Sequence, residues 1–169
     1  MTPAPYFCDD SSTLYCGDAL AISRSLDDQS VGCIVTSPPY YGLRDYGTEG
    51  QYGLEDSPGE YVSTMRALFR ELRRVLVDDG TLWLNLGDSY AGSWGNQGHD
   101  IEHADLHATY RGADVLPNRR RTGSIRSGMP AAKNLLGMPW RVALALQEDG
   151  WILRNDIIWH KRSAMPESV

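Results

Sequence analysis

Hydrophobic positions along the chain alternate between two spacings, one typical of strands and one typical of helices. Compact β-branched or aromatic runs predict strands at residues 12–16, 31–36, 81–86 and 151–159. Apolar residues at steps of three or four predict helices at residues 19–26, between Ser57 and Asp79, and at residues 139–146. This alternation is typical of an α/β fold with a mostly parallel sheet flanked by helices. Ligands of such sheets bind beyond the carboxyl ends of the strands.

The helix that follows Ser57 has the clearest signals. Ser57, Pro58 and Glu60 form a capping box with proline at the first helical position. Asp79 and Gly80 are expected to end the helix. Its apolar residues share one face, which we expect to be core: Tyr61, Met65, Leu68, Phe69, Leu72, Val75 and Leu76. The run at residues 31–36 reads as a strand buried on both faces.

Composition narrows the class of protein. The 169 residues correspond to about one average domain. With 41% apolar and 22% charged residues, the composition excludes disorder, a coiled coil and a membrane-spanning protein for most of the chain. Three cysteines without CxxC spacing, Cys8, Cys16 and Cys33, argue against a disulfide framework and a zinc site. No secretion signal precedes the first predicted strand, so we expect a cytoplasmic protein.

Charge is distributed unevenly. The net charge of −6 argues, taken alone, against a nucleic-acid-binding protein. A polar stretch without periodicity extends from residue 87 to about residue 133, and loops longer than about 15 residues are usually functional or disordered. Its second half carries one acidic residue, Asp114, and six basic ones: Arg111, Arg119, Arg120, Arg121, Arg126 and Lys133. This stretch is either a solvated loop or a segment that binds DNA phosphates on an acidic body.

Unusual sequence follows three of the predicted strands, at residues 17–20, 37–42 and 85–88. The central one, SPPYYG, has two prolines that are expected to hold a stiff extended turn with carbonyls free to face a ligand. Ser37 adds an acceptor, and Tyr40 adds a flat apolar face. An aromatic amine would use all three features, because its nitrogen is a poor nucleophile until acceptors hold its hydrogens.

Residues 35–47, VTSPPYYGLRDYG, resemble the catalytic motif of DNA methyltransferases that methylate exocyclic amines, (Asp/Asn/Ser)-Pro-Pro-(Tyr/Phe/Trp). Residues 14–20, 68–92 and 135–168 resemble further blocks of the permuted, β-type subgroup of these N4-cytosine and N6-adenine enzymes. In that subgroup the catalytic half precedes the cofactor-binding half. The resemblance implies a Rossmann-like fold, double-stranded DNA as substrate and S-adenosylmethionine as cofactor.

The resemblance also implies roles for residues of the motif. The side chain of Ser37 and the carbonyl of Pro38 would accept hydrogen bonds from the amine of a base flipped out of the duplex. Pro39 would fix the turn, and Tyr40 would stack on the base. The amine then attacks the methyl group of the cofactor in line. Cytosine C5 chemistry is set aside, because Cys33 lies inside a strand without a preceding proline.

Further assignments follow from the same resemblance. Asp18 would contact the adenine amine of the cofactor, with Ala19 or Leu20 against its ring and Thr36 at the same site. Serine at position 37 favours N4-cytosine, while N6-adenine stays open.

DNA contacts are assigned to Tyr41 and Arg44 and to the basic run Arg119, Arg120, Arg121 and Arg126. Arg44, Asp45 and Tyr46 line the base pocket or form a surface turn. His99, His103 and His107 have helical spacing, but their acidic surroundings favour an exposed polar helix over a metal site.

One part of the family pattern is missing. The sequence holds no glycine-rich cofactor motif, and the two central strands that accompany it would leave a gap with unpaired edges. We expect residues 1–169 to be the catalytic half of one methyltransferase domain, completed by a missing C-terminal half or a complementing chain, with residues 88–133 as an insert that contacts DNA. The alternatives are a non-catalytic remnant or accessory subunit and an amine methyltransferase acting on RNA or protein. A prokaryotic or phage origin agrees with all of these.

Overall fold

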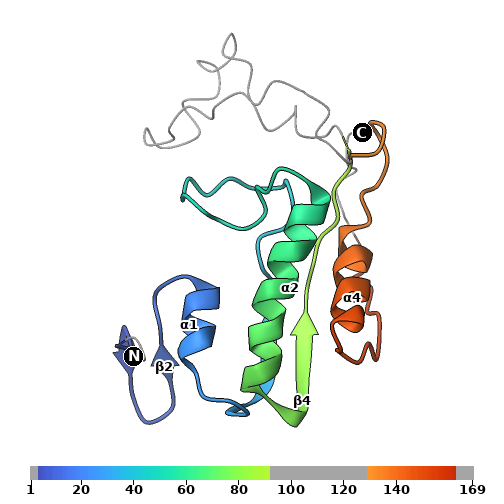
Figure 1. Ribbon diagram of the computed structural model, residues 1–169. Coiled ribbons are helices and arrows are strands. Elements are labelled where there is room, and N and C mark those ends of the chain that lie inside the picture. Colours follow the sequence, from blue (N-terminus) through green and yellow to red (C-terminus); the bar gives the residue numbers. More distant parts are fainter. Residues whose placement is uncertain (1–3, 92–128, 163–169) are drawn as a thin grey trace. The chain divides into compact units, whose positions relative to one another are not determined.

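The computed structural model describes residues 4–91 and 129–162 (Figure 1). The chain forms two compact units by its internal contacts. The first comprises Met1–Pro38, Val62–Leu86 and Pro139–Arg154. The second comprises Pro39–Tyr61, Gly87–Met138 and Asn155–Val169. Among the described residues, no helix combines the length and apolarity needed to cross a bilayer.

The first unit contains a two-stranded parallel sheet. It pairs β3 (Val31–Thr36) with β4 (Leu76–Leu84), so that Cys33 lies opposite Thr81 and Val35 opposite Trp83. The predicted strand at residues 31–36 and the parallel pairing are confirmed. A complete doubly wound sheet is not: the only other sheet among the described residues is the antiparallel pair β1 (Phe7–Cys8) and β2 (Thr13–Leu14).

The central helix α2 (Pro58–Val75) begins as its capping box predicts, since the amide of Glu60 donates to the Ser57 hydroxyl over 3.1 Å. The predicted end at Asp79 is wrong, because β4 starts at Leu76. The amide of Ser30 donates to the Val75 carbonyl over 2.8 Å, so a segment distant in sequence binds the end of the helix. The predicted apolar face is largely buried, including Met65, Leu68 and Phe69.

One face of the β3–β4 sheet is uncovered in the described part of the chain. Ile34 and Leu82 are half-buried, whereas Cys33 is exposed and the side chains of Val35 and Trp83 are 79% and 53% exposed. The prediction of a strand buried on both faces is therefore wrong for β3. Periodicity identified the strand, but burial depends on chain that lies elsewhere in the sequence.

Two shorter helices agree with the predictions: α1 (Ala19–Ser25) and α4 (Met138–Glu148). The strand predicted at residues 151–159 is wrong, since these residues belong to no helix or strand. Ile152 and Ile158 are 80% and 81% exposed. An apolar run becomes a strand only when a neighbouring backbone satisfies its amides and carbonyls, and no described strand does so here.

Within the second unit, the two ends of the long polar stretch lie side by side. The amide of Ala91 donates to the Asn134 carbonyl over 2.8 Å, and the amide of Lys133 donates back to Ala91 over 2.8 Å. Tyr90 and Leu135 form a β-bridge. This part of the chain packs against a core that includes Tyr41, Tyr61, Leu136 and Met138.

Three arginines of α2 bind the residue that follows α4. Arg66 and Arg70 reach the carboxylate of Asp149 over 3.1 and 2.6 Å, and Arg73 donates to its carbonyl over 3.1 Å. Hydrogen bonds from Arg70 and then Arg66 lower the pKa of Asp149 from the ordinary 3.8 to about 2. A carboxylate whose pKa is lower in the folded than in the unfolded state stabilises the fold at pH values above its unfolded-state pKa. This contribution is lost as the pH falls through its folded-state pKa.

Asp149→Asn should therefore lower the urea midpoint of unfolding at neutral pH, because the arginines lose their ionised partner. The difference from the wild type should shrink as pH falls from about 4 to about 2, where Asp149 becomes protonated. Chemical denaturation at several pH values measures it. Asp79→Asn, at an exposed carboxylate, is the matched control. Equal midpoints for the two variants at neutral pH would show that the network contributes nothing.

Candidate functional site

The carboxyl ends of β3 and β4 meet in the first unit, as expected from their parallel pairing. The amide of Asn85 donates to the Thr36 carbonyl over 2.9 Å. The side chain of Asn85 then reaches the hydroxyl of Ser37 at 3.5 Å. Ser37 is exposed, and Pro38 after it is buried. Two of the three unusual strand ends in the sequence are thus brought together around the first residue of the motif.

In the second unit, the ring of Tyr40 lies directly against Gly87. A Cβ atom added to Gly87 would be 2.6 Å from Cδ2 and 2.8 Å from Cε2 of that ring. No side chain fits in this space without displacing the ring. The missing side chain of Gly87 therefore leaves the space that the Tyr40 ring occupies. In the sequence, Gly87 was noted only as a glycine that follows a predicted strand.

Gly53 makes a similar approach to the backbone of the motif. Its φ angle is +92°, and an added Cβ would lie 2.7 Å from the carbonyl oxygen of Tyr40 and 3.3 Å from that of Pro39. Its own carbonyl accepts from the amide of Gly42 over 2.7 Å. A glycine is required here both by conformation and by space.

Two buried hydroxyl groups bind carbonyls of the same segment. Tyr61, in the first turn of α2, donates to the Pro39 carbonyl over 3.0 Å, and its ring centroid is 5.6 Å from that of Tyr41. Ser89 donates to the Tyr41 carbonyl over 3.0 Å. Burial raises the pKa of the Tyr61 hydroxyl, and the charges of Glu55 and Tyr40 act in the same direction. The sequence predicted Tyr61 only as a core residue.

The residues assigned to the cofactor lie in the first unit. Asp18 caps the start of α1, where its carboxylate accepts from the amide of Ala21 over 2.8 Å. Asp18 and Ala19 are exposed, while Leu20 and Thr36 are half-buried. The carboxylate has a clear local role at the helix start, and its contact with a cofactor stays a prediction.

The residues assigned to DNA contacts differ in their placement. Tyr41 is 1% exposed, with its ring against Tyr61, so its side chain belongs to the core of the second unit. Arg44 and Tyr46 are exposed in a turn held by Gln51, whose amide nitrogen donates to the Arg44 carbonyl over 3.0 Å. Outside the described residues lie the basic run and the histidine series: Arg119, Arg120, Arg121, Arg126, His99, His103 and His107.

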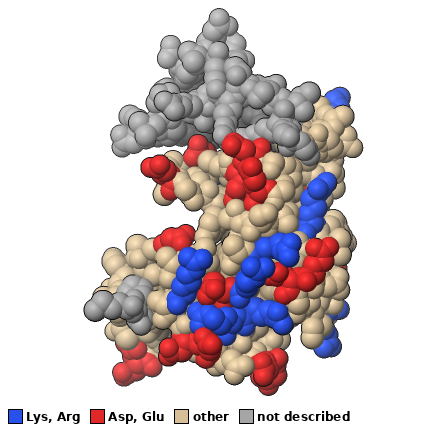
Figure 2. All heavy atoms as spheres, viewed as in Figure 1, with Lys and Arg blue, Asp and Glu red and all other residues tan. Residues whose placement is uncertain are grey.

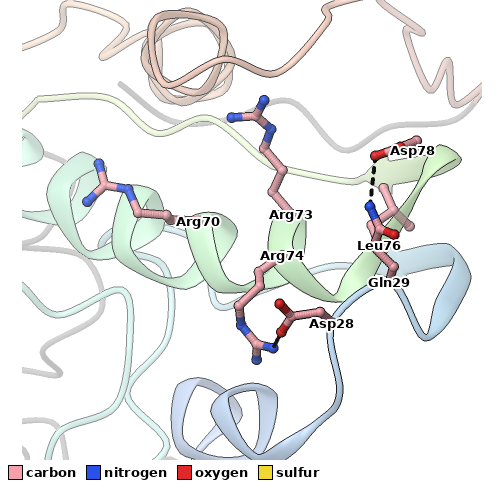
Figure 3. A pocket seen from close by; sticks show the side chains of 7 residues that line it. All are labelled: Asp28, Gln29, Arg70, Arg73, Arg74, Leu76 and Asp78. Carbon is pink, nitrogen blue, oxygen red and sulfur yellow. Dashed lines mark hydrogen bonds and ion pairs between the residues drawn. The ribbon is translucent and has the colours of Figure 1, made fainter.

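A separate hollow of about 530 Å³ lies on the first unit, beside the amino ends of β3 and β4 (Figure 3). Both of its carboxylates have a partner: Asp28 binds Arg74, and Asp78 accepts from the side-chain amide of Gln29 over 3.0 Å. Figure 2 likewise shows basic side chains interspersed with carboxylates on the visible face. The hollow lies at the strand ends opposite to Ser37 and is not the candidate site.

The comparisons with known proteins agree with the motif. A family model described as DNA methylase matches residues 31–169. The chain belongs to this DNA methylase family. Relatives include the type II methyltransferases M.XycI of Xanthomonas campestris pv. cyanopsidis and M.Cfr9I of Citrobacter freundii, each 50% identical over 94% of this chain and 49% of the relative. M.SmaI of Serratia marcescens is 48% identical over 94% of this chain and 51% of the relative.

This DNA methylase chain thus spans about half the length of the curated relatives it matches. No solved structure matches it significantly. The family is one of S-adenosylmethionine-dependent methyltransferases, and the described part of the chain has a small parallel sheet with helices. The matched region includes the motif, α2, β4 and α4.

Proposed function

We propose that this chain is the catalytic half of a site-specific DNA methyltransferase that methylates the exocyclic amine of a flipped base. The observation that carries the proposal is the Ser37-Pro38-Pro39-Tyr40 segment at the carboxyl end of β3, in a chain of the DNA methylase family. Serine at position 37 favours the N4 amine of cytosine, and the N6 amine of adenine is the alternative.

The chemistry needs accurate placement more than an acid or base. S-adenosylmethionine supplies an electrophilic methyl group when it is bound. Ser37 and the carbonyl of Pro38 accept hydrogen bonds from the base amine, which directs the nitrogen lone pair along one line. Tyr40 stacks on the base, and its ring lies directly against Gly87. These roles use acceptors and an aromatic face, so no titrating side chain of the motif is needed.

The residues of this chain fit only one end of the cofactor. The exposed carboxylate of Asp18 would accept from the adenine amine, while Ala19, Leu20 and Thr36 would line the same site. The sequence has no glycine-rich turn of the FxGxG type for the remainder of the molecule. We propose that a complementing segment supplies that turn, since the relatives are about twice as long as this chain.

The uncovered face of the β3–β4 sheet is the proposed docking surface for that complementing segment. Cys33, Val35, Thr81 and Trp83 form an exposed and mostly apolar surface, and burying it would stabilise the assembly.

Double-stranded DNA is the proposed substrate. The basic run in the insert at residues 88–133 would bind its phosphates, and Arg44, which is close to the motif in sequence, would make a further DNA contact. Such an enzyme would act in the cytoplasm of a prokaryotic cell.

A fusion tests this proposal. Residues 1–169 are joined to the part of M.Cfr9I that this chain does not cover, and transfer of a labelled methyl group from S-adenosylmethionine to DNA is measured. We expect transfer by the fusion and none by residues 1–169 alone. Mass spectrometry after alkylation should also show that the thiol of Cys33 reacts in the isolated chain and is protected in the fusion.

Four outcomes would count against the proposal or a part of it. Transfer by residues 1–169 alone would show that the cofactor site is complete in this chain. A folded fusion that binds cofactor and DNA without transfer would favour a non-catalytic accessory role. Transfer to RNA or protein but not to DNA would show that DNA is not the substrate. Reactive Cys33 in an active fusion would show that the docking surface lies elsewhere.

A further inference from the structure

Each of three successive backbone carbonyls in and after the motif, those of Pro39, Tyr40 and Tyr41, accepts a hydrogen bond. The Pro39 carbonyl accepts from the Tyr61 hydroxyl at 3.0 Å, and the Tyr41 carbonyl accepts from the Ser89 hydroxyl at 3.0 Å. The Tyr40 carbonyl between them accepts from the amide of Leu43 at 3.4 Å. Two of these donors are side chains from other parts of the chain, the first turn of α2 and the segment after Gly87.

The two hydroxyl groups are held in place. Tyr61 is 1% and Ser89 is 3% exposed. The ring of Tyr61 packs against Tyr41 at a tilt of 51°, which fixes the direction of its hydroxyl. Because its pKa is raised by burial, Tyr61 keeps its proton and acts as a donor at ordinary pH.

Holding the Pro39 carbonyl has a consequence for the preceding peptide. The carbonyl of Pro38 and the carbonyl of Pro39 are related only by φ and ψ of Pro39. The proline ring fixes φ near −65°. A hydrogen bond that fixes the Pro39 carbonyl fixes ψ as well. The two carbonyls then cannot rotate relative to each other, and the direction of the Pro38 oxygen is determined.

We infer that Tyr61 and Ser89 are positioning residues of the methylation site: they lock the backbone after Ser37 so that the Pro38 carbonyl keeps one direction for the base amine. The inference rests on the proposed function for the identity of the amine. Its structural part, that two buried hydroxyls lock this backbone, stands on the observed hydrogen bonds alone.

Tyr61→Phe tests the inference, because it removes the hydroxyl and keeps the ring that packs on Tyr41. In the fusion with the remainder of M.Cfr9I, kcat should fall about tenfold, while KM for S-adenosylmethionine should stay within about twofold. Tyr6→Phe is the matched control, since it makes the same chemical change in a side chain that is 81% exposed and has no assigned role. A kcat for Tyr61→Phe equal to that of the control would overturn the catalytic part of the inference.

Amide hydrogen exchange of residues 1–169 gives a readout that needs no activity. In Tyr61→Phe and Ser89→Ala, the amides of Gly42 and Leu43 should exchange several-fold faster, whereas those of α4 should be unchanged. Unchanged exchange at Gly42 and Leu43 would overturn the locking itself. A global loss of protection in both variants would also overturn it, because the hydroxyls would then serve only the core. If the wild-type fusion is inactive, the proposed function fails while this exchange result still decides the locking.

Discussion

Gly87→Ala is expected to lower the rate of methyl transfer by the completed enzyme about 100-fold, because misplacing a reacting group by about 1 Å costs that much. The new Cβ would lie 2.6 Å from Cδ2 of the Tyr40 ring, closer than real contacts allow. The ring is attached to a backbone that Gly53 and Tyr61 already confine, so it must tilt rather than move away as a whole. A tilted ring no longer offers its face to the base.

The control for this change is Gly59→Ala. A Cβ at Gly59 would approach the Ser57 hydroxyl oxygen at 3.9 Å, an ordinary contact, and Gly59 lies in the first turn of α2. We expect its activity to match the wild type. Single-turnover transfer rates and the far-ultraviolet circular dichroism of both variants measure the effect. An active Gly87→Ala variant with a native fold would show that the position of Tyr40 does not limit the reaction.

Tyr40→Ala is expected to reduce kcat/KM about 100-fold, near the upper limit for losing one base-stacking contact of about 1–3 kcal/mol. Tyr40→Phe keeps the ring against Gly87 and should retain most of the activity. The comparison separates stacking by the ring from any contribution of the hydroxyl. If Tyr40→Ala stayed within about threefold of the wild type, the stacking role would be wrong.

The sequence predicted well those features whose causes are local. Ser57, Pro58 and Glu60 mark the start of α2 because the cap is formed by residues three apart. The limits of β3 follow from a compact run that ends at two prolines. The parallel pairing of β3 and β4 follows from the helix that connects them, and it brings Ser37 near Asn85.

Features that depend on distant chain were predicted poorly. The end of α2 at Val75 depends on an amide donated by Ser30, which no local pattern indicates. The run at residues 151–159 has the composition of a strand but no described partner. The exposure of Val35 and Trp83 among the described residues is likewise not indicated by any local pattern.

The candidate site shows the same division. The motif residues Ser37, Pro38, Pro39 and Tyr40 were found from their own chemistry. The groups that hold them, Gly53, Tyr61, Gly87 and Ser89, come from other segments and had no motif of their own. A glycine directly after a strand is a weak signal of close approach, and a tyrosine on the apolar face of a helix reads as core. Tyr41 was assigned to DNA from its place in the motif, yet it is buried.

The central claim is that this chain directs a methyl group to the exocyclic amine of a base through the Ser37–Tyr40 segment. The most direct test is to digest DNA methylated by the fusion and to identify the modified nucleoside by mass spectrometry. We predict N4-methyldeoxycytidine with the wild-type chain and at most traces with Tyr40→Ala. N6-methyldeoxyadenosine would support methylation of an exocyclic amine but would show that the target base is adenine. 5-Methyldeoxycytidine, or equal product from Tyr40→Ala, would contradict the account.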